Sequence, residues 1–164
     1  MTNDEIRAAL DDRHVLALTM WAEAGGDWRE GRSSVEERIA VGCVVRNRLP
    51  AWSRYRATAQ TVEAICLAPK QFSCWASIGG AANYARLMAL AEAIATGVSD
   101  GDALYRETLY LADGILAGTI LDRTGGATLY WAPAAMVPPG RIPAWAVGRS
   151  PVAIGSQLFL DDSA

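Results

Sequence analysis

The sequence is poor in the residues on which metal-dependent and nucleophile-dependent hydrolases rely. It contains a single histidine, His14, and none of the patterns HxxxH, HExxH or CxxC. Zinc hydrolases take two or three His or Cys ligands at short spacing, and a serine or cysteine nucleophile needs a histidine beside it. His14 adjoins an apolar stretch and is interpreted as a helix residue. The sequence therefore disfavours a zinc amidase and a His-dependent peptidase, and we expect no metal ion and no cofactor.

Cysteine is also sparse. Cys43, Cys66 and Cys74 are odd in number and do not make the disulfide framework of a small secreted domain. Three free thiols and a Cys66–Cys74 bridge both remain open. The N-terminal residues 1–5 are polar and acidic, whereas a secretory signal begins with a basic region and an apolar run. We expect synthesis in the cytoplasm without a signal peptide.

Positive charge is limited too. The net charge is −3, and Lys70 is the lone lysine. Nucleic-acid binders usually carry a basic face, so we expect no nucleic-acid partner. No run of 18 apolar residues lacks a charge, so we expect no integral membrane segment.

What is present fits one globular domain spanning residues 1–164, with 51% hydrophobic and 20% charged residues. Periodicity and capping signals predict an α+β fold, in which a mainly helical body over about 11–118 precedes a small β region over about 122–160. The apolar helix after Ser33-Ser34-Val35-Glu36-Glu37 is expected to be central. The expected helices are 14–22, 35–48, 62–67, 83–95 and 102–118, the last two as an antiparallel hairpin, and the expected strands are 127–131, 143–146 and 152–160.

The stretch 21–31 is the most unusual, because Glu23 ends an apolar helix and Gly25 and Gly26 follow directly. Apolar neighbours and the negative end of the helix both favour the protonated form of a carboxyl group. A protonated carboxyl is what a general acid needs to cleave a glycosidic bond. Six Trp and five Tyr fit stacking on sugar faces, although aromatic residues also fill cores. Glu23 is therefore the candidate catalytic acid.

Two further places carry polar candidates. Asn47 follows the apolar core of its helix, and a helix cap and a functional role are both open for it. The loop 70–75 mixes aromatic and polar side chains, a composition that often lines ligand grooves.

Several blocks of the sequence stand in a characteristic order. They are 21–31, then 39–48 (IAVGCVVRNR), Thr61 to Ile65, Gln71-Phe72-Ser73, 122–130 (DRTGGATLY), Pro143-Ala144-Trp145 and 154–159 (IGSQLF). Together they resemble the bacterial and phage cell-wall hydrolases of the spore-cortex-lytic type. The resemblance runs from about Val15 to Leu160.

The resemblance implies a lysozyme-like body related to lytic transglycosylases, with the active-site groove between the helices and the β region. Glu23 would protonate the bond between N-acetylmuramic acid (MurNAc) and N-acetylglucosamine (GlcNAc) and then take a proton from the muramoyl C6 hydroxyl, giving a 1,6-anhydro product. The expected substrate is the glycan strand of peptidoglycan. The candidates for binding it or orienting Glu23 are Asn47, Gln71, Phe72, Ser73 and Tyr130.

The sequence departs from the family pattern at some positions and leaves alternatives open. Gly25 replaces an Arg, about six residues around 32–37 are inserted, and the late His is absent. A hydrolytic muramidase would use a second acid, for which Asp27 and Glu36 are the candidates. A non-catalytic cell-wall-binding or virion module is the other alternative. We expect a monomer that reaches the cell envelope through a holin or a phage tail, as an endolysin or a virion component does.

Overall fold

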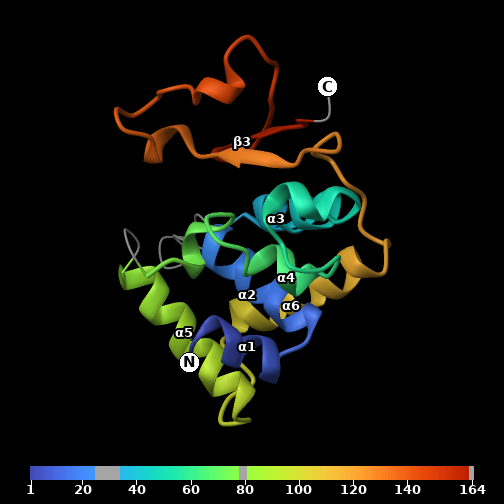
Figure 1. Cartoon of the computed structure of the whole chain (residues 1–164), viewed down its shortest axis with the longest axis vertical. Coiled ribbons are helices and arrows are strands. Elements are labelled where there is room, and N and C mark those ends of the chain that lie inside the picture. The colour runs from blue at the N-terminus through green and yellow to red at the C-terminus, as the bar shows by residue number, and fades with distance from the viewer. Residues whose placement is uncertain (25–33, 78–80, 163–164) are drawn as a thin grey trace.

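The computed structural model describes residues 1–24, 34–77 and 81–162, where a helical body precedes a small antiparallel sheet (Figure 1). The expected α+β class is confirmed. The α-helices are α1 (Asn3–Ala9), α2 (Asp12–Ala24), α3 (Val35–Arg48), α4 (Val62–Cys66), α5 (Ala81–Ala95) and α6 (Ala103–Leu116). The strands are β1 (Leu129–Trp131), β2 (Val152–Ile154) and β3 (Gln157–Leu160), and the 3₁₀ segments are η2 (Leu49–Tyr55), η3 (Ser73–Trp75), η4 (Pro133–Ala135) and η5 (Ala144–Ala146).

Helix α2 is the centre of the helical body. The backbone N–H of His14 donates to Asp11 Oδ1 at 3.0 Å, which caps the helix at the predicted place. Every side chain from Val15 to Ala22 is buried. The helix packs against α3, α4, α5 and α6. The expectation that 35–48 is the central helix is therefore wrong, because α2 has that position.

Helix α3 is instead the layer between the helical body and the sheet (Figure 1). Val41 and Val45 belong to the main helical core. Ala40 and Val44 face the other way and form a second core with Phe159 of the sheet. This double burial explains why the helix is apolar on every face.

The first turn of α3 also fixes the hairpin between β2 and β3. Ser34 accepts the Glu37 N–H at 3.2 Å and caps the helix as predicted. The Glu37 carboxylate does not complete a capping box, because it accepts hydrogen bonds from the N–H and the hydroxyl of Ser156. Gly155, at φ 58°, lies against this carboxylate where a Cβ atom would clash. The hairpin turn therefore has a fixed position over the helix.

The sheet has the order β1-β3-β2, and both pairs are antiparallel. Tyr130 pairs with Phe159, and their rings stack at 5.7 Å. Strands were predicted here, but the prediction of a strand at 143–146 is wrong. That segment is η5, in which the Ala146 N–H donates to the Pro143 carbonyl at 2.9 Å. Its hydrogen bond is local, so it adds nothing to the ladder.

The predicted hairpin of α5 and α6 is also wrong. Helix α6 packs mainly against α2 and α3, whereas α5 packs against η3, α1 and α2. The apolar face of α6, which includes Tyr105, Leu111 and Ile115, is buried in the main core. Packing on α2 and α3 buries more of the apolar face of α6 than packing on α5, its neighbour in sequence, would bury.

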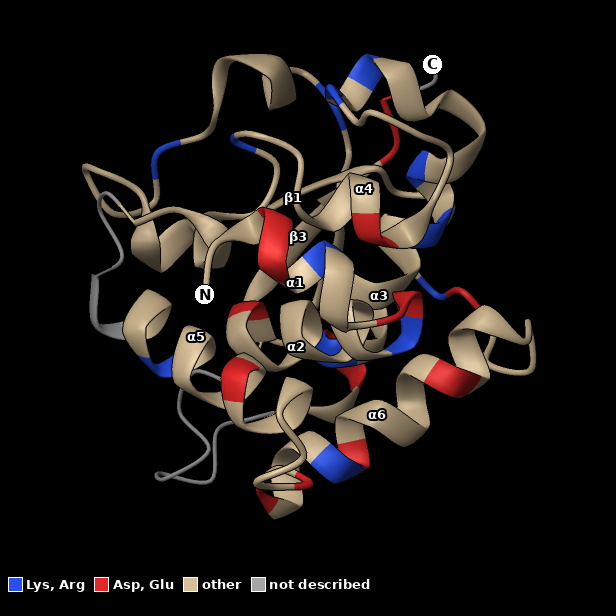
Figure 2. Cartoon of the chain, turned by 60° about the horizontal axis from the view of Figure 1, so that its bottom comes forward, with Lys and Arg blue, Asp and Glu red and all other residues tan. Residues whose placement is uncertain are grey.

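Acidic and basic residues are interspersed over the helical body and the β region (Figure 2). Among the described residues three ion pairs link separate helices of the body: Arg7 with Glu63 at 3.2 Å, Arg13 with Asp113 at 2.7 Å, and Arg38 with Glu107. No helix within the described ranges combines the length and the apolar character that a membrane crossing requires.

Candidate active site

The Glu23 carboxylate, at the end of α2, is held by three hydrogen-bond donors from distant parts of the chain. Oε1 accepts from the Cys74 N–H at 2.8 Å and from the Ser73 hydroxyl at 3.2 Å. Oε2 accepts from the Tyr130 hydroxyl at 2.8 Å. The side chain is half-buried, so the charge is partly removed from water and fixed in direction.

Segment η3 is held in place by a buried hydrogen-bond chain to α2. The Trp75 indole N–H donates to Thr19 Oγ1 at 2.9 Å, and Thr19 Oγ1 donates to the Val15 carbonyl at 2.8 Å. Since Ser73 and Cys74 precede Trp75 in the same turn, this chain fixes the two donors against Glu23.

Tyr130 comes from β1 and approaches Glu23 from the other side. Its ring lies between Phe72 at 6.4 Å and Phe159 at 5.7 Å, measured between ring centroids. Desolvation, together with the neighbouring charge of Glu23, raises the pKa of Tyr130 well above its ordinary value. The phenol therefore keeps its proton and remains a donor to the carboxylate.

Glu23 lines a groove of about 680 Å³ between the helical body and the β region. The described residues that line it are Glu23, Arg48, Lys70, Gln71, Phe72, Ser73, Ala76, Leu129, Tyr130, Trp131, Ala132, Ala135, Met136, Trp145 and Gln157. One wall comes from the ends of α2 and α3 and the loop 70–76, and the other comes from the β region. The predicted residues Glu23, Gln71, Phe72, Ser73 and Tyr130 are thus brought together.

Trp131, Trp145, Gln157 and Arg48 are among the lining residues that were not predicted from the sequence. Trp145 is 43% exposed and meets Trp131 edge to face at 5.2 Å, so it presents an aromatic surface to the groove. Gln157 donates to the Glu23 carbonyl at 3.4 Å. The position of Arg48 after Asn47 in the block 39–48 is the sequence signal that could have identified it as a groove residue.

Arg48 is a buried cation at the floor of the groove. Its Nε donates to the Thr128 carbonyl at 2.7 Å, and its Nη1 donates to Gln71 Oε1 at 3.3 Å. The guanidinium also lies 4.9 Å from the ring centroids of Tyr55 and Phe72. Desolvation lowers the pKa of Arg48 from its ordinary value, but an arginine remains charged at neutral pH.

Asn47 and Phe72 have different environments from those expected of sugar-binding residues. Asn47 Nδ2 donates to Asp122 Oδ2 at 2.8 Å and to the Ala127 carbonyl at 3.0 Å, and Asn47 does not line the described part of the groove. It anchors the segment that leads into β1, and Leu49 is the C-cap of α3. Phe72 is only 2% exposed, so it mainly supports Tyr130 and Arg48.

The candidates for a second acid are Glu36 and Asp27. Glu36 is on the first turn of α3 and lines a different pocket. Asp27 lies outside the described residues. Over the described ranges, no group of three His, Cys, Asp or Glu side chains is arranged to hold a metal ion.

All three cysteines are free and buried, so the Cys66–Cys74 bridge is not formed. Burial raises the pKa of Cys43 to about 11 and that of Cys66 to about 12. Burial and then the charge of Glu23 raise the pKa of Cys74 well above its ordinary value. A thiol that keeps its proton is a poor nucleophile. The side chain near Cys74 that suits chemistry is therefore the carboxylate.

Comparison with known proteins identifies the family. The family model described as Cell Wall Hydrolase matches residues 32–160, which is most of the chain. No curated protein and no solved structure matches. The matched range begins after Glu23 but includes the loop 70–76, β1 and the rest of the groove. The chain therefore belongs to the cell wall hydrolase family.

Proposed function

We propose that this chain cleaves the glycan strands of peptidoglycan at the MurNAc–GlcNAc bond as a lytic transglycosylase, with Glu23 as the acid and base. Membership of the cell wall hydrolase family indicates peptidoglycan as the substrate. The observation that carries the finer proposal is the single carboxylate among the described residues that line the groove. Among the described lining residues Glu23 alone is acidic, and three donors fix its position.

The donors indicate which oxygen of Glu23 carries the catalytic proton. The backbone N–H of Cys74 can only donate, so Oε1 must accept in every protonation state. The hydroxyl of Tyr130 can donate to a carboxylate and accept from a carboxylic acid. The acid proton therefore belongs on Oε2, and the Tyr130 hydroxyl can adjust to its gain and loss.

The reaction uses the carboxyl group of Glu23 twice, first as an acid and then as a base. Glu23 protonates the glycosidic oxygen, the bond to the muramoyl C1 breaks, and GlcNAc leaves with a free hydroxyl. The muramoyl C6 hydroxyl then bonds to C1 and gives its proton to Glu23. A 1,6-anhydro ring forms without water, and Glu23 is regenerated as an acid. A hydrolytic glycosidase would instead use a second carboxylate.

The remaining groove residues suit a neutral sugar with acetamido groups. Trp145 offers an exposed aromatic face for stacking. Gln71 accepts from Arg48 through Oε1, which leaves its Nε2 amide group to donate to an acetamido carbonyl. Neutral hydrogen-bonding groups around one acid are typical of sugar sites.

The test is mass spectrometry of purified peptidoglycan after digestion by the wild type and by Glu23→Gln. The amide keeps the shape of Glu23 but cannot transfer its proton, so we expect a loss of roughly a thousandfold or more in rate. Anhydromuropeptides should appear with the wild type only. Glu92→Gln is the matched control, since Glu92 is an exposed acid on α5 that does not line the groove.

The other outcomes separate the rival activities. Reducing muramic ends that vanish with Glu23→Gln would make the protein a muramidase and direct the search for a second acid to Asp27. Equal digestion by the two proteins would refute the role of Glu23. Retention on the wall without soluble products would indicate a binding module. We further propose that the protein acts on the envelope after release by a holin or delivery by a phage tail.

A further inference from the structure

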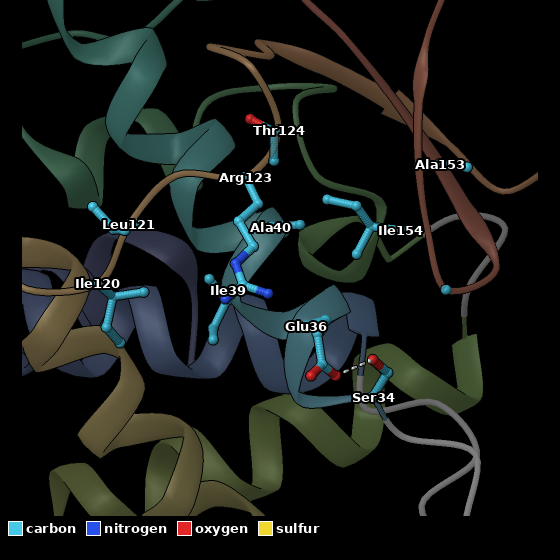
Figure 3. Close-up of a pocket in the computed structure, with 11 residues that line it drawn as sticks. Ser34, Glu36, Ile39, Ala40, Ile120, Leu121, Arg123, Thr124, Ala153 and Ile154 are labelled. Atoms are coloured by element: carbon cyan, nitrogen blue, oxygen red, sulfur yellow. Dashed lines mark hydrogen bonds between the residues drawn. The ribbon is translucent and has the colours of Figure 1, made fainter.

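A second pocket lies at the opposite edge of the sheet from the catalytic groove. It has a volume of about 550 Å³ and lies between the start of α3, the segment 120–124 and the turn that joins β2 to β3 (Figure 3). It shares no lining residue with the groove that contains Glu23. Strand β1 borders the groove and β2 borders this pocket, so the two sites lie on either side of β3.

The pocket combines an apolar floor with two opposite charges. Ile39, Ile120 and Ile154 supply aliphatic surface, and Figure 3 shows the Arg123 guanidinium directed across the pocket toward Glu36. Within the described part of the chain neither of these two charged side chains forms an ion pair. Both are exposed, so a ligand can reach them.

The neighbouring charged groups that the structure describes take part in contacts within the fold. Glu37 accepts from Ser156, Arg38 pairs with Glu107, and Asp122 accepts from Thr124 and Asn47. Hydrogen bonds from its own backbone N–H and from the Ser34 hydroxyl lower the pKa of Glu36, so its carboxylate is charged at neutral pH. Among the described residues, Glu36 and Arg123 are therefore the charges of this surface that remain available to a ligand.

We propose that this pocket binds the stem peptide of peptidoglycan, with Arg123 on a peptide carboxylate and Glu36 on a peptide ammonium. The proposal rests on peptidoglycan being the substrate. A stem peptide carries carboxylates, a free amine and small methyl side chains, which match the cation, the anion and the aliphatic floor. A volume of about 550 Å³ lies within the range of sites that hold molecules the size of a short peptide.

Such a site would be a second point of binding on a polymer of repeating units. Peptides branch from successive muramic residues along a strand, so a weak peptide contact raises the local concentration of glycan at the groove. The expected contribution is to KM on peptide-bearing strands, because Arg123 and Glu36 do not touch the bond that is cleaved.

The binding test uses the full chain and a synthetic tetrapeptide, L-Ala-γ-D-Glu-meso-diaminopimelate-D-Ala, in an NMR titration. We expect one site with a Kd of roughly 0.1–1 mM, weakened about fivefold or more by Arg123→Gln and by Glu36→Gln. The matched control is Arg141→Gln, which removes an exposed arginine that lines neither site and leaves the Kd unchanged. Equal binding of a peptide with acetylated amines and amidated carboxylates would overturn the proposal.

The activity test separates this proposal from the proposed function. Wild type and Arg123→Gln are compared on peptide-bearing peptidoglycan and on glycan strands stripped of peptide. We expect Arg123→Gln to raise KM about fivefold on the first substrate and to match the wild type on the second. Equal KM values for the wild type and Arg123→Gln on both substrates would refute the peptide site. Failure of the wild type to cleave either substrate would refute the glycosidase assignment, and the titration would still test the pocket.

Discussion

The hydroxyl of Tyr130 is a donor to Glu23 that can be removed with little change in packing. Tyr130→Phe keeps the ring between Phe72 and Phe159 and deletes the 2.8 Å bond to Oε2. A hydrogen bond to a charged group is worth about 1.5–3 kcal/mol, so we expect kcat to fall roughly tenfold to a hundredfold. KM should change little, because the proposed role of the hydroxyl is in proton transfer. Steady-state kinetics on soluble glycan fragments measure both constants.

A matched control distinguishes this effect from a loss of structure. Tyr84→Phe removes the hydroxyl of a half-buried tyrosine on α5, away from the groove, and should leave kcat unchanged. Both variants should keep a thermal midpoint close to that of the wild type. A rise in KM with unchanged kcat in Tyr130→Phe would mean that Tyr130 binds sugar and does not assist Glu23.

At the residue scale the sequence located the groove largely through short blocks. Glu23, Ser73 and Tyr130 are far apart in the chain, and the structure joins them by hydrogen bonds. Arg48 and Trp145 were not predicted as lining residues, because their exposure to the groove depends on how the β region lies over α3. Local composition contains no information about such a juxtaposition.

At the scale of the elements, Gly42 is where α3 packs closely against Met20 of α2 and Ile115 of α6. A Cβ atom there would lie 2.6 Å from Ile115 Cδ1 and 2.8 Å from Met20 Sδ. Alanine favours a helix over glycine by about 1 kcal/mol, whereas overpacking a core costs about 1–3 kcal/mol. We expect Gly42→Ala to be destabilising on balance, by up to about 2 kcal/mol, as measured by urea unfolding.

A double-mutant cycle gives this prediction its control. Ile115→Val removes the Cδ1 atom that the new methyl group would meet. Gly42→Ala should therefore cost less in the Ile115→Val background than in the wild type. Equal costs in the two backgrounds would mean that crowding against Ile115 is not the cause.

Helix periodicity predicted that these elements exist but not which surfaces they share. The apolar faces of α3 indicated burial, but no sequence pattern divides them between the helical core and the sheet. The expected pairing of α5 with α6 failed for the same reason. An apolar face packs against the largest complementary surface available, which for α6 is α2 and α3.

In the whole molecule, the helical body and the sheet are joined by several buried or half-buried polar contacts. Glu37 accepts from the Ser156 hydroxyl, Arg48 donates to the Thr128 carbonyl, and Asn47 donates to Asp122. The groove that contains Glu23 lies along this junction, so its shape depends on both parts keeping one arrangement. We expect the two parts to unfold together as one domain.

The pH dependence of stability tests one of these contacts. Desolvation acts to raise the pKa of Asp122, but hydrogen bonds from Thr124 and Asn47 outweigh it and lower the pKa below its ordinary value. A carboxyl group whose pKa is lower in the folded state stabilises the fold at neutral pH. That stability is lost as the pH falls below the unfolded-state value toward the folded-state value. Asp122→Asn should therefore be destabilising at neutral pH and show a smaller further loss in acid.

The measurement is urea unfolding near pH 7 and near pH 3, followed by far-UV circular dichroism for the helices and by tryptophan fluorescence, to which Trp131 and Trp145 of the β region contribute. At neutral pH the variant replaces one accepting oxygen with an NH2 group, which must face a donor of Asn47 or of Thr124, so we expect a loss of about 1–3 kcal/mol. The difference between the two proteins should shrink at the lower pH, where the wild-type carboxylate gains a proton. Coincident transitions by the two probes would mean that the link joins parts of a single cooperative unit. A fluorescence change that precedes the loss of helix would instead mean that packing around the tryptophans, which occur in both parts of the chain, is lost before the helices unfold.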